Sequence, residues 1–278
     1  MRNLWQTAEE KWENATFANN FIFCNILSTD LDLCRELLEL LLHIEIERLE
    51  LAQSERSVKT DYNSHGVRLD VYTRGDGRIF DVELQTADTD DLAKRARYYQ
   101  GVIDVDNLPE GVLYRELKDT YIIFICLFDL FGRGLPVYTF ENVCAEDSGV
   151  KLNDRAFKVF FNARDCDRIT DREARSFFKY LAGERADSDL TRRIDAGVAR
   201  AKRNRDGKRS FMTLEQYVLY EGERVRKETL AETRRENAVN FLRETDLPPE
   251  QIAQCCSLPL DEVLALKEKL ASEAAPVS

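Results

Sequence analysis

The stretch that decides the fold is Arg68-Leu-Asp-Val-Tyr-Thr-Arg-Gly-Asp-Gly-Arg-Ile-Phe-Asp-Val-Glu-Leu-Gln85, which predicts a β-hairpin. On either side of Gly75-Asp76-Gly77, polar and apolar residues alternate with the period of two that a strand requires. Glycine supplies the positive φ that tight hairpin loops need. The alternation places four polar side chains on one face of the hairpin: Asp70, Asp81, Glu83 and Gln85.

The acidic residues of this hairpin suggest a cation site. If Thr73 and Arg78 flank a four-residue loop, Asp70 lies opposite Asp81 and diagonal to Glu83, with about 7–8 Å between the diagonal Cα atoms. Like charges that face each other across a hairpin weaken it, so a bound cation would offset the repulsion. Magnesium is typically held by one or two carboxylates with waters and substrate phosphates. The alternative is a solvated polar face that binds nothing.

The segments that follow the hairpin extend the pattern. Asp70 is followed by Glu83-Leu-Gln85, by Lys94-Arg-Ala-Arg-Tyr-Tyr-Gln100 and by the apolar run 121–128. From about Phe17 to the C-terminal region, this order resembles the PD-(D/E)XK nuclease superfamily, and within it the transposase-associated branch of Rpn-type recombination-promoting nucleases. The resemblance implies an α/β restriction-endonuclease-like core, with a mixed central sheet flanked by helices, followed by a helical C-terminal region.

The resemblance also implies an activity and the residues that perform it. The expected function is that of a metal-dependent DNA endonuclease, linked to recombination or mobile elements. Asp70 and Glu83 would be the metal ligands, for Mg²⁺ or with Mn²⁺ as a substitute. Gln85 stands where the general pattern has Lys, as is common in this branch, and would position water or the metal shell.

The missing Lys leaves the expected site in need of a cation. Arg95 is the candidate to contact the scissile phosphate, because it lies beside Tyr99 on the helix predicted over residues 88–104. The alternative is that Arg95 forms a salt bridge with the acidic hairpin face. A second function class therefore stays open, a non-hydrolytic DNA-binding or regulatory protein with a degraded nuclease site.

Composition bounds the architecture. A chain of 278 residues with 44% hydrophobic and 33% charged residues can bury a full core. We expect a nuclease-like core over 1–165, a helical extension over 166–245 and a small helix-turn-helix-like tail over 246–278. Periodicity predicts helices over 31–43, 171–182, 188–204 and 213–243, and strands over 44–51, 121–128 and 156–161.

The chain also lacks targeting signals. No run approaches the roughly 18 apolar residues of a membrane span, and the first residues lack the apolar core of a signal peptide. The seven cysteines show no zinc-binding spacing, so Cys24, Cys34 and Cys126 are expected in the core of a protein in a reducing compartment. We therefore expect a cytoplasmic protein.

The charge distribution offers one dense basic stretch. A net charge of −11 argues against a general nucleic-acid binder, although local basic groups can still bind phosphates. Residues 192–209 hold eight Lys and Arg against two Asp. Because these charges spread around a helix, a solvated face is the preferred interpretation. Glu36, on the helix over 31–43, is either a surface residue or the acid that completes the metal site in some members of the superfamily.

The tail resembles a helix-turn-helix unit over residues 248–266. Its expected core positions are Ile252, Ala253, Cys256, Leu258, Val263 and Leu266, with Ser257 where the turn usually has Gly. The second helix begins with Asp261 and Glu262, which repel phosphates at the place where a reading helix meets bases. We therefore favour packing, or a homo-oligomer through the C-terminal helices, over DNA reading. The charged stretch 213–243 has few large apolar residues and would stand partly away from the core or pair with another subunit.

Overall fold

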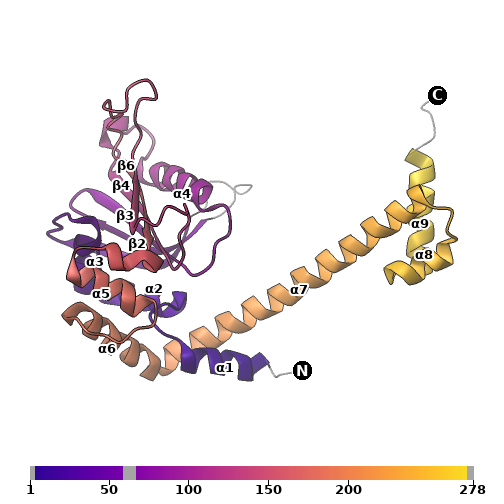
Figure 1. Ribbon diagram of the computed structural model, residues 1–278, viewed down its shortest axis with the longest axis horizontal. Helices are drawn as coiled ribbons and strands as arrows, with labels where there is room; N and C mark the ends of the chain where they lie inside the picture. The colour runs from indigo at the N-terminus through magenta and orange to yellow at the C-terminus, as the bar shows by residue number, and fades with distance from the viewer. Residues whose placement is uncertain (1–3, 59–66, 274–278) are drawn as a thin grey trace. The chain divides into compact units, whose positions relative to one another are not determined.

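The computed structural model describes residues 4–58 and 67–273, which form two compact units (Figure 1). The first unit runs from Glu10 to Arg209 and contains the sheet. The second comprises the residues from Ser210 onward, together with the N-terminal residues up to Glu9.

A mixed sheet forms the centre of the first unit, with the strand order β1-β2-β3-β4-β6-β5. The first three strands are antiparallel, β3, β4 and β6 are parallel, and β5 runs antiparallel to β6. Their bounds are β1 Leu49–Val58, β2 Val67–Gly75, β3 Arg78–Gln85, β4 Asp119–Cys126, β5 Val137–Phe140 and β6 Ala156–Asn162. This is the mixed sheet that the sequence predicts. The prediction of a strand over 44–51 is wrong in its start, because His43 ends α3 in the left-handed region and an irregular segment follows.

The hairpin of β2 and β3 turns more tightly than expected. Gly75 pairs with Arg78, so the loop has only the two residues Asp76 and Gly77, with φ of 51° and 73°. Positive φ at both positions is the type I′ geometry, whose twist matches that of the strands. Gly75 has a different role, because a Cβ added there would lie 2.5 Å from the carbonyl oxygen of Arg48. The predicted four-residue loop is therefore wrong.

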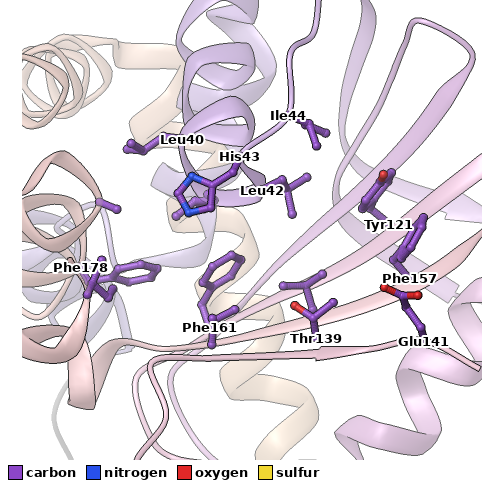
Figure 2. A pocket seen from close by; sticks show the side chains of 15 residues that line it. Leu40, Leu42, His43, Ile44, Tyr121, Thr139, Glu141, Phe157, Phe161 and Phe178 are labelled. Atoms are coloured by element: carbon purple, nitrogen blue, oxygen red, sulfur yellow. The ribbon is translucent and has the colours of Figure 1, made fainter. Parts of the chain in front are cut away.

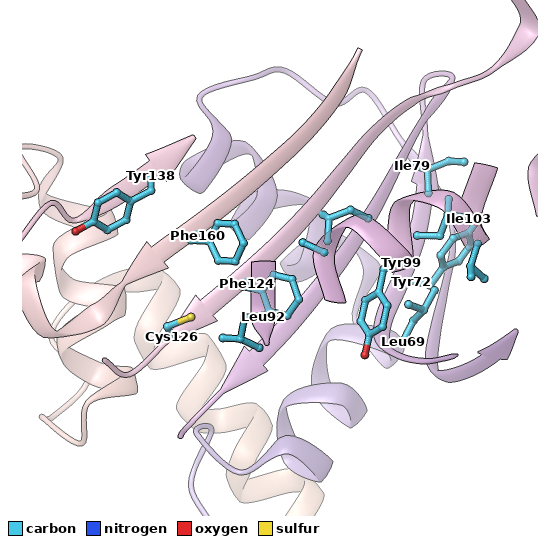
Figure 3. Packing of buried hydrophobic residues seen from close by; sticks show 13 residues of the cluster. Leu69, Tyr72, Ile79, Leu92, Tyr99, Ile103, Phe124, Cys126, Tyr138 and Phe160 are labelled. Carbon is cyan, nitrogen blue, oxygen red and sulfur yellow. The ribbon is translucent and has the colours of Figure 1, made fainter. Parts of the chain in front are cut away.

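Helices cover both faces of this sheet (Figure 1). On one face lies α4 (Leu92–Asn107), the crossover that parallel pairing of β3 with β4 requires. Figure 3 shows the cluster beneath it, in which Leu92, Tyr99 and Ile103 pack against sheet residues such as Phe124. The helix begins at Leu92 and not near 88, because Asp90 has a φ of 59° and Asp91 occupies the N-cap position.

The other face is covered by α2 (Asn20–Thr29), α3 (Leu31–Leu42) and α5 (Arg172–Leu181). Phe161 of β6 packs against Phe178 of α5 with ring centroids 5.5 Å apart. Helix α6 (Asp189–Arg203) starts with a capping box between Ser188 and Thr191, and its Gly197 lies beside Ile26 of α2. Because both faces are covered, the interior of β3 from Ile79 to Leu84 is buried.

The remaining helices are α1 (Leu4–Asn14), α7 (Arg205–Glu244), α8 (Pro249–Cys256) and α9 (Leu260–Glu273), with short 3-10 turns η1 (Tyr114–Glu116) and η2 (Ala163–Arg168). The end of α7 packs with α8 and α9 in a cluster that includes all six core positions predicted for the tail, joined by Ala238, Phe241 and Leu242 of α7. Ser257 has a φ of 52°, which explains why glycine is the usual residue at that turn.

All seven cysteines are free thiols, and the predicted burial of Cys24, Cys34 and Cys126 is confirmed. Burial, followed by the charge of Asp30, raises the pKa of Cys34 to about 12, so this thiol is inert at neutral pH. Within residues 4–58 and 67–273, every helix is too short or too polar to cross a membrane.

Candidate active site

The tight turn decides which acids of the hairpin meet. Tyr72 pairs with Asp81 and Val71 with Val82, so the register brings Asp70 level with Glu83. The expected pairing of Asp70 with Asp81 is therefore wrong by two residues. A shift of two keeps every side chain on its face and changes only its partner across the strands.

One direct hydrogen bond joins Asp70 to Glu83, and a second joins Asp70 to the neighbouring backbone of β3. The backbone N–H of Asp70 donates to Oε1 of Glu83 at 2.9 Å, and Oδ2 of Asp70 accepts from the N–H of Leu84 at 3.2 Å. The amide of Asn20, the first residue of α2, donates to Oδ1 of Asp70 at 2.9 Å. The two carboxylates are thus held in one small region by two strands and one helix.

Arg95 reaches this region from α4. Its guanidinium donates to Oε2 of Glu83 at 3.4 Å, to Oε1 of Gln85 at 3.3 Å and to the hydroxyl of Tyr99 at 3.0 Å. It also lies over the Tyr99 ring, 5.4 Å from its centroid. The four residues predicted from the sequence, Asp70, Glu83, Gln85 and Arg95, therefore form one connected network.

The acids at this site, Asp70, Asp81 and Glu83, are more buried than acids on a solvent-exposed strand face would be. The exposed fractions are 8% for Asp70, 0% for Asp81 and 1% for Glu83. Burial, and then the charge of Asp70, raise the pKa of Glu83 to about 8. Burial, and then the charges of Glu83 and Asp70, raise the pKa of Asp81 well above its ordinary value. The alternative of a solvated face is wrong, because α4 covers this side of β3.

The donor set fits a hard divalent cation. Asp70 and Glu83 offer carboxylate oxygens and Gln85 an amide oxygen, which are the ligand types of Mg²⁺ and Mn²⁺. Both oxygens of Asp81 are buried without a hydrogen-bond partner, so the patch holds more acid than its protein neighbours offset. In the described part of the chain, no group of three His, Cys, Asp or Glu side chains is arranged as a complete metal cage. Mg²⁺ commonly keeps several waters and uses only one or two carboxylates.

The structure changes the assignment of two residues, Asn20 and Glu36. Asn20 was missed by sequence reasoning, since it lies fifty positions before Asp70 and nothing in its local pattern marks it. Glu36 does not join the site. Its carboxylate pairs with Arg193 of α6 on the other side of the sheet, so Glu36 has the surface role.

A cavity of about 300 Å³ lies on the face of the sheet opposite α4 (Figure 2). It is lined by the end of α3, including His43, by Phe178 of α5 and by residues of β4, β5 and β6 on the face of the sheet opposite α4, such as Phe157. None of the four network residues lines this cavity. The candidate chemistry is therefore separate from it.

Comparison with known families supports this arrangement of strands and helices. Residues 18–189, more than half of the chain, match the model of the PD-(D/E)XK nuclease family transposase, and the chain belongs to this family. The mixed sheet flanked by helices, with a helical C-terminal region, is consistent with its restriction-endonuclease-like α/β fold. No curated protein and no solved structure gives a significant match.

Proposed function

We propose that this protein is a metal-dependent DNA endonuclease that hydrolyses phosphodiester bonds. The observation that carries the proposal is the hydrogen-bonded Asp70 and Glu83 pair, with Gln85 and Arg95 attached, within the residues that match the nuclease family model. Membership of a nuclease family supports DNA as the substrate. A role in recombination or in mobile elements, and a cytoplasmic location, belong to the same proposal.

Asp70 and Glu83 would hold the metal ion, Mg²⁺ or Mn²⁺, and Gln85 would orient water beside it. A bound divalent ion lowers the pKa of its water and offsets negative charge in the phosphoryl-transfer transition state. It would also allow Glu83 to ionise, because an opposite charge lowers a carboxyl pKa that burial has raised. Asn20 and the N–H of Leu84 keep the Asp70 carboxylate oriented while this happens.

Arg95 would supply the cation that Gln85 cannot. Its guanidinium donates to the oxygens of Glu83 and Gln85 through long hydrogen bonds. If Asp70 and Glu83 held the metal ion, the guanidinium, steadied by its hydrogen bond to Tyr99, would be able to contact a substrate phosphate.

The test is nicking of supercoiled plasmid by the full chain with Mg²⁺, Mn²⁺ or chelator. Wild type should cut only with metal, and Asp70→Asn should not cut. Glu36→Gln is the matched control, since it neutralises an acid outside the network. Manganese binding followed by electron paramagnetic resonance should be lost in Asp70→Asn and kept in Glu36→Gln. Wild type that binds no metal and cuts no DNA contradicts the proposal.

The second candidate function is DNA binding without hydrolysis. The observation that favours it is that Arg95 already pairs with the buried Glu83, which partly satisfies that acid without a metal. A protein with this second function would bind DNA equally in chelator and in Mg²⁺ and would leave the plasmid intact. Association of copies through α7, α8 and α9 is compatible with either function, and light scattering of the full chain would test it.

A further inference from the structure

The strand directions bring several distant segments to one end of the sheet. Because β3, β4 and β6 are parallel, Gln85, Cys126 and Asn162 pair in one row at their carboxyl ends. The β4–β5 connection, residues 127–136, must therefore lie at this end, as must η2, which follows β6 directly. The start of α4 lies here too, and in Figure 3 its first residue, Leu92, is beside Cys126. This is the end that carries Glu83 and Gln85.

Four basic side chains occupy these segments, and we call them the rim cations: Lys94 and Arg97 of α4, Arg133 of the β4–β5 connection and Arg164 of η2. All four are exposed. None makes an ion pair or a side-chain hydrogen bond with any residue in the described ranges. Their charges are thus available to a partner from solution.

The side of α4 that bears Arg97 is turned toward β6. Asp104 lies two helical turns after Arg97 and therefore on the same side of the helix. Burial raises the pKa of Asp104, while its hydrogen bond to Gln100 and the charge of Lys158 on β6 lower it. The exposed Arg97 therefore lies on the β6 side of α4, and Arg95 lies on the opposite side of the helix.

The acids at the same end occupy other positions or are already engaged. Asp88 accepts from the N–H of Asp90, and Asp91 accepts from the hydroxyl of Thr89, all within the loop that precedes α4. Asp129 accepts hydrogen bonds from Tyr138 and from the backbone of its own loop. Asp165 accepts from the amide of Asn162. The rim cations thus outnumber the unengaged acids on the β4–β6 side.

The basic stretch that stands out in the sequence differs in this respect. Within residues 192–209, Arg193 pairs with Glu36, Lys208 pairs with Glu13, and Lys202 donates to the backbone oxygen of Glu13. Arg192 also donates to the backbone oxygen of Asp187, so at least half of the eight cations of this stretch are engaged within the fold, while Arg200, Arg203 and Arg205 are exposed. The density of Lys and Arg along the chain therefore does not measure the charge that is available to a partner.

We infer that the rim cations form the track that holds the phosphate backbone of DNA against the Asp70 and Glu83 site. From β3 to β6 the sheet spans two strand spacings, about 10 Å, which matches the rise of roughly three base pairs along the axis of a DNA duplex. The Asp70 and Glu83 site would then face one phosphate of a DNA strand, and the rim cations would hold the phosphates next to it. The choice of DNA rests on the proposed function. The assignment of the surface rests on the strand topology and the unpaired charges.

The test is binding of a labelled 20-base-pair duplex by fluorescence anisotropy, in chelator, at several salt concentrations. The rim variant carries Lys94→Gln, Arg97→Gln, Arg133→Gln and Arg164→Gln. The matched control carries Arg192→Gln, Arg200→Gln, Arg203→Gln and Arg205→Gln, which remove the same charge from exposed positions of the basic stretch. Melting temperatures of both variants should equal that of wild type, since surface charges contribute little to stability.

The rim variant should bind on the order of 10² more weakly at low salt, with a log–log salt slope smaller by about 3–4, and the control should change little. Equal weakening of both variants, or a rim variant that binds like wild type, overturns the assignment. So does wild type that binds no duplex. Because chelator is present throughout, wild type that binds through the rim but never cuts plasmid with Mg²⁺ or Mn²⁺ supports this inference and contradicts the proposed hydrolysis.

Discussion

Strand β3 and the C-terminal helical cluster bury side chains in opposite ways. In the part of the chain that the structure describes, the cluster of α7, α8 and α9 buries apolar groups such as Ile252 and Val263, each 0% exposed. The strand buries Asp81 and Glu83 just as deeply, beside Asp70. Burying an acid without full compensation lowers stability, whereas burying an aliphatic side chain raises it. The buried acids of β3 therefore lower the stability of the fold, whereas the buried side chains of the C-terminal cluster raise it.

The largest effect should come from neutralising the buried acid itself. Glu83→Gln should slow plasmid nicking by at least about 10², because a ligand to the catalytic ion is lost. Its melting temperature in chelator should stay the same at neutral pH, where Glu83 is largely protonated, and should exceed that of wild type above about pH 8, since a neutral amide can still accept from the N–H of Asp70 and carries no charge to oppose Asp70. A sharp fall in melting temperature with nicking preserved would make Glu83 a structural residue.

Arg95 should rank next. Arg95→Ala should slow single-turnover nicking by about 10², because a preorganised charge at the scissile phosphate is removed. Arg95→Lys should recover part of the rate, since a point charge can still serve a phosphate. Thermal melting should change little, because Arg95 is partly exposed and its bond to Glu83 is long. Normal nicking with a lower melting temperature would assign Arg95 to the fold alone.

The pH dependence of stability sharpens the contrast further. Glu83 has a pKa of about 8 when folded, against an ordinary value of 4.5, so the folded state holds more protons between these values. The free energy of unfolding should therefore fall as the pH rises from about 5 to 8.5 in chelator. Melting followed by circular dichroism should show this loss in wild type and in Glu36→Gln. Glu83→Gln should show less of it, and an unchanged pH profile would contradict the assigned shift.

The C-terminal cluster should give the smallest effect on cleavage. Ile252→Ala should destabilise the second unit by about 2–5 kcal/mol, because a fully buried side chain leaves a cavity. Deletion of residues 246–278 should alter the stability or the oligomeric state, which light scattering measures, and should leave nicking within a few-fold of wild type. An unchanged oligomeric state together with weaker, less salt-dependent DNA binding would mean that the tail contacts phosphates.

Local pattern was sufficient for much of the fold. The positions predicted to form the core of the tail are those that pack, and the hairpin and the buried strand β4 are where alternation and apolar content place them. Each of these depends on residues close together in sequence. Helix and strand periods report which side of an element is buried, so local reading succeeds where one side faces a core.

The candidate site could be predicted only in part. Asp70, Glu83, Gln85 and Arg95 were accessible through the motif, and the structure connects them. Asn20 was not, because only the tertiary fold brings the start of α2 to β2. The burial of Asp81 and Glu83 was also missed. Alternation identifies two faces of a strand, but it cannot tell that a helix will cover the polar one.

The two-residue turn at Asp76 and Gly77 sets the register of the hairpin. The number of residues in that loop fixes which acid of β3 stands across from Asp70, since pairing is counted outward from Gly75 and Arg78. If Arg74 and Gly75 also joined the loop, so that Thr73 paired with Arg78, Asp70 would lie level with Asp81 while every side chain kept its face. A change in the turn, about seven residues from Glu83, would thus exchange one acidic partner for another, so the length of this turn is as much a part of the candidate site as the carboxylates.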